Sequence, residues 1–162
     1  MLVTLACVVP DIDGIGIVVD LVTRHSKHPT DWFSSYHHSL HTLLFAVVVT
    51  AVTVLISHHP WKTMGFVFLS FHLHLVEDLL GSRGPDGYQW PIPYLMPFSH
   101  AADLSWSGQW ALNGWPNLVI TSVLLVVTFY LARTRGYSPL EMISEKADAA
   151  FVSTLRRRFS TT

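Results

Sequence analysis

Residues 61–80 read WKTMGFVFLSFHLHLVEDLL, an apolar run whose second half carries His72, His74, Glu77 and Asp78. A helix of about 20 apolar residues is long enough to cross a bilayer. His74 and Asp78 are four positions apart, so both project from one face of such a helix. Ionisable side chains in a membrane segment are costly and are interpreted as functional by default. The run therefore predicts a membrane helix with a polar site near its C-terminal end.

Two further apolar runs, Leu40–Ser57 and Trp115–Ala132, contain no charged residue. Both lack the polar stripe that surface helices of soluble proteins show. Met1–Val9 is too short to span a membrane and is interpreted as the last turns of a helix whose usual N-terminal start is missing. The fold class predicted is all-α: an integral membrane bundle of three full transmembrane helices plus a short N-terminal helical remnant. Buried helices of a soluble α-protein are the alternative.

The composition supports lipid surroundings. The chain has 162 residues, of which 50% are hydrophobic and 13% are charged, and its mean hydropathy is +0.38. Soluble domains carry about 25% charged residues. The net charge of −1 provides no basic field for nucleic acid. With a single cysteine, Cys7, the chain can form neither an intrachain disulfide nor a thiolate zinc cage, so any metal must be bound by histidine and carboxylate.

The segments between the runs define the expected organisation. Asp11–Ser35 is predicted to be a loop, and Gly81–Gly114, rich in Gly, Pro and Trp, is predicted to be a long loop over the site. Residues 1–135 are expected to form a membrane-embedded domain that contains the metal site. Residues 136–162 are expected to form a polar, basic cytoplasmic tail, in which Pro139–Phe159 could be an amphipathic surface helix.

The distribution of basic residues predicts the orientation. One side of the predicted bundle carries Lys62, Arg133, Arg135, Lys146, Arg156, Arg157 and Arg158, and the other carries Arg24, Lys27 and Arg83. Cytoplasmic segments are enriched in Lys and Arg. The C-terminus is therefore expected in the cytoplasm, and the site at the outer face of the inner (plasma) membrane.

Alternating helix directions bring polar residues from four segments to one membrane face. Imidazole and carboxylate ligands without thiolate suit zinc, manganese or iron. One or two divalent ions, with zinc preferred, are expected to be bound by Asp11, Asp13, His38, His74 and Asp78. His41 or His100 is expected to act as a general acid or as a further ligand. His37 and His41 are also four positions apart, and His38 and His41, three apart, are an alternative pair.

Structural roles remain open for several of these residues. Asp11 and Asp13 could instead cap the helix that follows them. Asp78 could form an ordinary ion pair with Arg83. Any single histidine in an apolar helix can be a hydrogen-bonded packing residue, so the prediction rests on the convergence of the whole set.

The motifs PDID at residues 10–13, HHSLH at 37–41 and HLHLVED at 72–78, with a Gly- and Pro-rich loop ending in PF, resemble a known family. They are similar to the membrane-bound metal-dependent hydrolases, which are grouped with the LexA-regulated inner-membrane hydrolases. The resemblance covers about residues 1–100. The family's Thr-His-Ser-Leu element has His37 in place of threonine here, and its preceding His-Arg-Gly is replaced by residues 32–34.

The resemblance implies a metal-dependent hydrolase that acts on an ester or phosphoester. Its His-x-x-x-Asp element is similar to that of zinc-dependent phospholipase C, which by analogy favours a phosphoester or lipid substrate. Membrane lipids are then the expected partners. A metal or proton transporter is a second interpretation, although the apolar stretches 43–56 and 118–129 lack the polar path that it needs. A haem- or quinone-binding redox protein, with facing histidine pairs, is a third.

Overall fold

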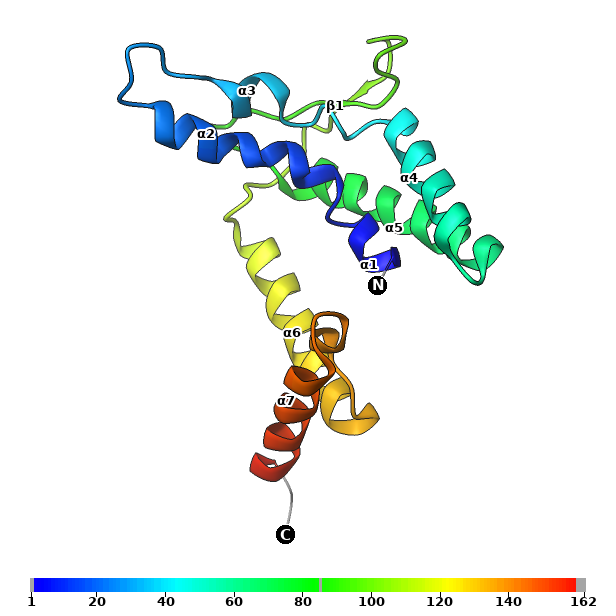
Figure 1. Ribbon diagram of the computed structural model, residues 1–162. Helices are drawn as coiled ribbons and strands as arrows, with labels where there is room; N and C mark the ends of the chain where they lie inside the picture. The colour runs from blue at the N-terminus through cyan, green and yellow to red at the C-terminus, as the bar shows by residue number, and fades with distance from the viewer. Residues whose placement is uncertain (1, 85, 160–162) are drawn as a thin grey trace. The chain divides into compact units, whose positions relative to one another are not determined.

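The computed structural model of the chain describes residues 2–84 and 86–159, which are mostly helical (Figure 1). Two compact units, Met1–Leu112 and Asn113–Thr162, are described here one at a time. The elements of the first are α1 (Leu2–Ala6), η1 (Pro10–Ile15), α2 (Gly16–Thr23), α3 (Trp32–Tyr36), α4 (Leu43–Ile56), α5 (Pro60–Gly81), β1 (Ile92–Pro93) and β2 (Asp103–Leu104). Those of the second are α6 (Trp115–Arg135), η2 (Pro139–Met142) and α7 (Glu145–Arg158).

Two helices, α5 and α6, are long and apolar enough to cross a membrane by length and composition. The expectation of three full spans is corrected, because α4 has only 14 residues. At 1.5 Å per residue it is about 21 Å long, short of the roughly 30 Å of a bilayer core. The helix starts late because Thr42 caps it, its hydroxyl accepting a hydrogen bond from the N–H of Phe45 at 3.1 Å.

The core of the first unit lies between α4, α5 and β1. Ala46, Phe71, Leu75 and Ile92 are buried and contact one another, and partly buried apolar side chains surround them. The first residue of α4 is tied to the loop after β1, because the N–H of Leu43 donates to the carbonyl of Tyr94 at 2.8 Å. The core thus holds the beginning of α4 against the C-terminal half of α5.

The short helix α1 is fastened to α5 by polar contacts in an otherwise apolar region. The hydroxyl of Ser70 donates to the carbonyl of Val3 at 2.9 Å and lies 2.7 Å from the sulfur of Cys7. Because η1 begins three residues after Cys7, this anchor places Asp11 near α5.

The predicted loop over residues 11–35 is largely helical, which corrects that expectation. It contains η1, α2 and α3. The carboxylate of Asp20 accepts hydrogen bonds from the hydroxyl of Thr30 and from the N–H groups of Trp32 and Phe33, at 2.7–2.8 Å. These bonds satisfy free N–H groups at the start of α3 and hold it beside α2.

In its described residues, 81–84 and 86–114, the predicted loop contains the two-residue strands β1 and β2 and an isolated bridge between Arg83 and Ala111, and it is packed onto the end of α5. Ile92 pairs with Leu104 in the antiparallel ladder. The side-chain amide of Gln109, which is buried, donates to the carbonyl of Asp78 at 2.8 Å and to the hydroxyl of Ser82 at 3.1 Å. The loop therefore fixes the last turn of α5, where Asp78 lies.

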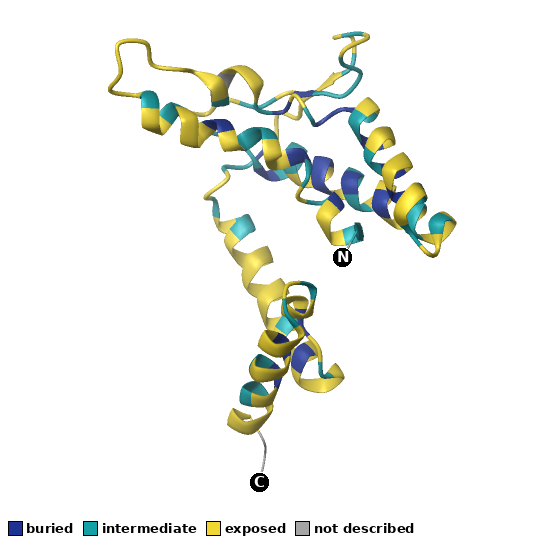
Figure 2. Cartoon of the chain, viewed as in Figure 1, coloured by how far each residue is buried: buried dark blue, intermediate teal, exposed yellow. Residues whose placement is uncertain are grey.

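In the second unit, α7 packs along the C-terminal half of α6. The ring of Phe129 lies 5.7 Å from that of Phe151, and the guanidinium of Arg156 donates to the carbonyl of Arg133 at 2.9 Å. The predicted tail helix is present as η2 and α7, and almost all of α6 is exposed within its unit (Figure 2). The expected division at residue 135, between membrane and cytoplasm, stays a prediction.

The bonds of Asp20 generate a prediction. In Asp20→Ala the N–H groups of Trp32 and Phe33 lose their acceptor, so their hydrogen exchange should become markedly faster while the amides of α5 keep their protection. Asp31→Ala is the matched control, since Asp31 is the N-cap of the same helix but makes no side-chain cap bond. Equal exchange rates in the two variants would contradict this account.

Candidate metal centre

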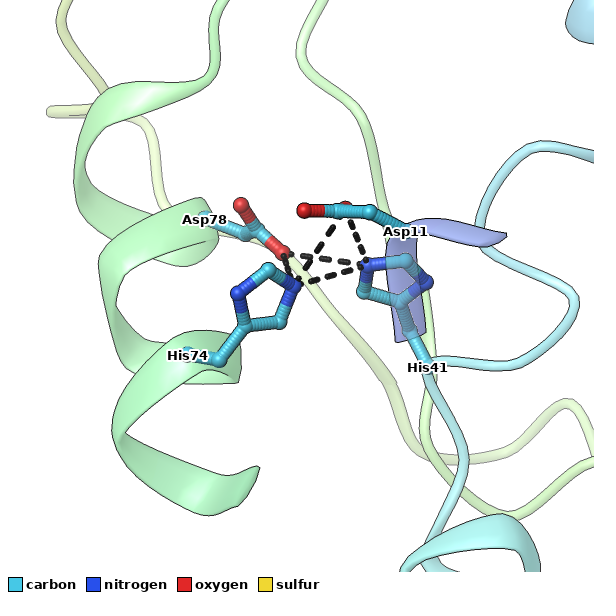
Figure 3. Close-up of side chains that lie close together, drawn as sticks. All are labelled: Asp11, His41, His74 and Asp78. Carbon is cyan, nitrogen blue, oxygen red and sulfur yellow. Dashed lines mark hydrogen bonds and ion pairs between the residues drawn. The ribbon is translucent and has the colours of Figure 1, made fainter. Parts of the chain in front are cut away.

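Four side chains from three segments meet at one point in the first unit (Figure 3). Asp11 comes from η1, His41 from the turn before α4, and His74 and Asp78 from neighbouring turns of α5. Each offers one ligand atom, and these four atoms lie within 4.8 Å of one another. The cluster is therefore a group that could hold a metal ion.

Five distances between the ligand atoms of the cluster are close to those around a small tetrahedral ion. The Nε2 atoms of His41 and His74 are 3.3 Å apart, and each lies 3.2 Å from Oδ2 of Asp78. Oδ1 of Asp11 lies 3.5 Å from the nitrogen of His41 and 3.4 Å from that of His74. Tetrahedral zinc with bonds of about 2.0–2.1 Å would separate its ligand atoms by about 3.3–3.4 Å.

Burial of most of this cluster favours the binding of a cation between its four side chains. The side chain of His41 is fully buried and that of His74 nearly so, whereas half of Asp11 is exposed. Oδ2 of Asp78 is buried and faces the two imidazole nitrogens, each 3.2 Å away. When both imidazoles are neutral, as metal ligation requires, the two carboxylates carry two negative charges, which are costly in a buried site unless they bind metal.

Asp13 lies behind His41 instead of joining the four ligand atoms. Its Oδ2 is 3.7 Å from Nδ1 of His41, the ring nitrogen that faces away from the cluster. The same carboxylate accepts a hydrogen bond from the N–H of Leu40 at 3.0 Å and contacts Nδ1 of His37 at 3.2 Å. Carboxylates in this position commonly orient metal-binding histidines. Neither η1 nor α2 has a side-chain cap bond, so the capping alternative for Asp11 and Asp13 is wrong.

The structure brings His41, rather than the predicted ligand His38, to the other three residues. The segment 37–41 is not helical, so the four-residue spacing of His37 and His41 does not place them on one helical face. His38 adopts φ of 75°, in the left-handed region that costs a non-glycine residue about 1 kcal/mol. The turn directs His38 toward the carbonyl of Pro91, 3.5 Å from its Nδ1.

The electrostatics of the site favour positive charge where the four atoms meet. Burial opposes ionisation of Asp11, but its contacts with His41 and His74 outweigh this and hold the pKa of the carboxyl below its ordinary value. Burial would likewise lower the pKa of His41, yet Asp11, Asp13 and Asp78 raise it to about 10. By contrast, burial and then the neighbouring imidazoles lower the pKa of His38 to about 4.

Other candidate residues lie outside the cluster. His100 is largely exposed and pairs with Asp103, 3.5 Å away. The two ring nitrogens of His72 contact the carbonyl of Phe68 at 2.8 Å and the hydroxyl of Tyr94 at 2.9 Å, so this histidine ties α5 to the loop. Asp78 faces the two imidazoles. The alternative was an ion pair with Arg83, and the described residues do not form it.

Sequence reasoning considered His37 only as a possible ligand, paired with His41, and assigned no contact to Trp90. His37 supports Asp13 and stacks on the ring of Phe33 at 4.4 Å. Trp90 packs edge-on against His37 and His38, with ring centres 5.4 and 5.5 Å away. The doubled histidine of the HHSLH motif was the available signal for His37, whereas nothing local connects Trp90 to this turn.

Comparison with known proteins identifies the family. The model of a family described as YdjM inner membrane protein matches residues 1–150, which is most of the chain. No curated protein and no solved structure matches the chain. The family's name and the two apolar helices both fit an inner-membrane protein. The chain belongs to the YdjM inner membrane protein family.

Proposed function

We propose that this protein is a membrane-bound, metal-dependent hydrolase that cleaves an ester or phosphoester. The observation that carries the proposal is the meeting of two imidazoles and two carboxylates from distant parts of the chain. A divalent ion held there would polarise the scissile group and lower the pKa of a water molecule toward neutral. The resemblance of the PDID, HHSLH and HLHLVED motifs to metal-dependent hydrolases supports the same reaction class.

His41, His74 and Asp78 are the ligands that we propose hold the ion. They are the three more buried members of the cluster, and α5 supplies two of them from one face. Zinc is the preferred ion because its tetrahedral geometry matches the spacing of the ligand atoms, while manganese and iron accept the same ligand types.

Asp11 has a different role in this proposal, because it is the exposed member of the cluster. A catalytic zinc site has three protein ligands and keeps its fourth position accessible to water or substrate. The carboxylate of Asp11 would lie next to an ion held by the other three residues, where it could bind that ion or accept a proton from a water molecule. Behind the cluster, Asp13 keeps Nε2 of His41 directed at the ion.

The competing functions fit the geometry less well. In a haem protein the macrocycle would lie between two axial imidazoles, but the Nε2 atoms of His41 and His74 are only 3.3 Å apart. His37 and His72 are already engaged, by Asp13 and Tyr94 respectively. A transporter needs polar groups along its whole path, and the described site is confined to one end of α4 and α5.

Metal content tests the ligand set. Purified protein should carry about one equivalent of zinc, manganese or iron by elemental analysis, and His41→Ala, His74→Ala and Asp78→Ala should each lose most of it, because a site with few ligands weakens sharply when one is removed. His38→Gly is the matched control, since glycine tolerates the left-handed turn. Full metal content in His41→Ala, or its loss in His38→Gly, would refute this ligand set.

Turnover separates the role of Asp11 from that of the ligands. In Asp11→Asn we expect retained metal but little or no release of product from a panel of labelled lipids and generic phosphoesters. Asp13→Asn should lose about 10- to 100-fold in metal affinity or activity, because His41 loses its orienting carboxylate. Turnover by wild-type protein that persists after chelation would overturn the metal mechanism.

We also propose that the C-terminus is cytoplasmic and that the metal centre faces the opposite side of the membrane. The support is the excess of Lys and Arg in the tail. With Cys7 replaced by serine, a cysteine at Tyr88, which is exposed, should react with a membrane-impermeant thiol reagent in intact spheroplasts. A cysteine at Lys146 should react only after lysis. The reverse pattern would invert the orientation.

A further inference from the structure

A cavity of about 460 Å³ opens within the first unit, next to the segment that carries His41. Its polar lining comes from the segment that leads into α4 and from the loop after β1. These polar residues are Ser35, His37, Ser39, Thr42 and His100. They offer hydroxyls and imidazoles, which can donate hydrogen bonds to phosphate or ester oxygens. No carboxylate is found among the lining residues that the structure describes. Asp13 and Asp103, which are not among them, pair with Nδ1 of His37 and of His100.

The rest of the lining is apolar and follows the beginning of α4. It consists of Leu40, Leu44, Phe45, Val48, Pro93, Met96 and Pro97. A second, almost wholly apolar cavity of about 220 Å³ shares Leu44 and Met96 with the first and extends the apolar surface to Val47 and Phe98. Together the two cavities join a polar region to an apolar one beside a helix whose outer side chains are exposed.

His37 connects this cavity to the metal centre. It lines the cavity and contacts Asp13, whose other oxygen faces His41. The neighbours of His41 in the chain, Leu40 and Thr42, line the cavity as well. A molecule with its polar group among these residues would therefore lie next to the segment that carries His41.

We propose that this cavity binds a phosphate-bearing lipid, with the phosphate near His37 and His100 and one acyl chain along Leu44, Phe45 and Val48. The inference rests on the proposed function and names its substrate class. The occupant is a lipid because the polar and apolar linings adjoin, and because α4 belongs to a chain of an inner-membrane family, whose surroundings supply acyl chains. Entry of one chain brings the phosphoester beside the metal centre without extracting the whole lipid.

Photo-crosslinking tests this site. Full-length protein in nanodiscs is irradiated with a lysophosphatidic acid that carries a diazirine in the middle of its acyl chain, and labelled peptides are mapped. Labels should fall on residues 44–48 and 93–97. Val48→Trp fills the cavity and should reduce labelling at least about tenfold, a change of about 1.4 kcal/mol in binding. The matched control is Val52→Trp, since Val52 is equally exposed on α4 (48% against 47%) but lines neither cavity.

Headgroup dependence distinguishes this site from general contact with bilayer lipid. Unlabelled lysophosphatidic acid should compete for labelling better than a monoacylglycerol with the same chain, and His100→Ala should remove that difference. Equal competition by the two lipids in wild type, or unchanged labelling in Val48→Trp, would overturn the inference.

Metal content and turnover of a short, soluble phosphoester by wild-type protein separate this inference from the proposed function. Labelling with no metal-dependent turnover of any substrate would leave a lipid-binding site and refute hydrolysis. Turnover without labelling of the cavity would leave the hydrolase and refute this lipid site.

Discussion

The structure depends on the pairing of two carboxylates with two buried imidazoles at the end of α5. Separate burial of these groups would be costly, so each is stable there only because the others are within 3.2–3.5 Å. That requirement ties together η1, the turn before α4 and the last turns of α5, which the sequence separates by about 30 residues at each step. The apolar core around Phe71 and Ile92 lies next to this point and holds the same elements.

Several contacts around the cluster hold its residues in place. Ser70 fastens α1 so that Asp11 follows close to α5. Asp13 links the N–H of Leu40 and the ring of His37 to the rear of His41. Gln109 holds the backbone of Asp78 from the loop. Polar contacts thus hold the segments that carry Asp11, His41 and Asp78, which favours preorganised ligands at a metal centre.

The proposed metal centre and the neighbouring cavity would suit a substrate at the lipid–water boundary. The centre is polar and half open at Asp11, whereas the cavity turns apolar along α4. An amphiphile likewise combines a polar and an apolar part in one molecule. The short length of α4 fits this division, since the helix begins only after the chain has placed His41 in the site and Thr42 in the cavity wall.

The sequence by itself determined the apolar helices, the family resemblance and three members of the cluster. The HLHLVED spacing puts His74 and Asp78 on one face, because helical periodicity is local, and PDID supplies Asp11. Only the tertiary structure decided between His38 and His41, since a left-handed turn at His38 redirects the chain. It alone revealed α2 and α3, which Asp20 joins across 10–13 residues. Such contacts depend on how distant segments pack, and no local pattern in the sequence predicts them.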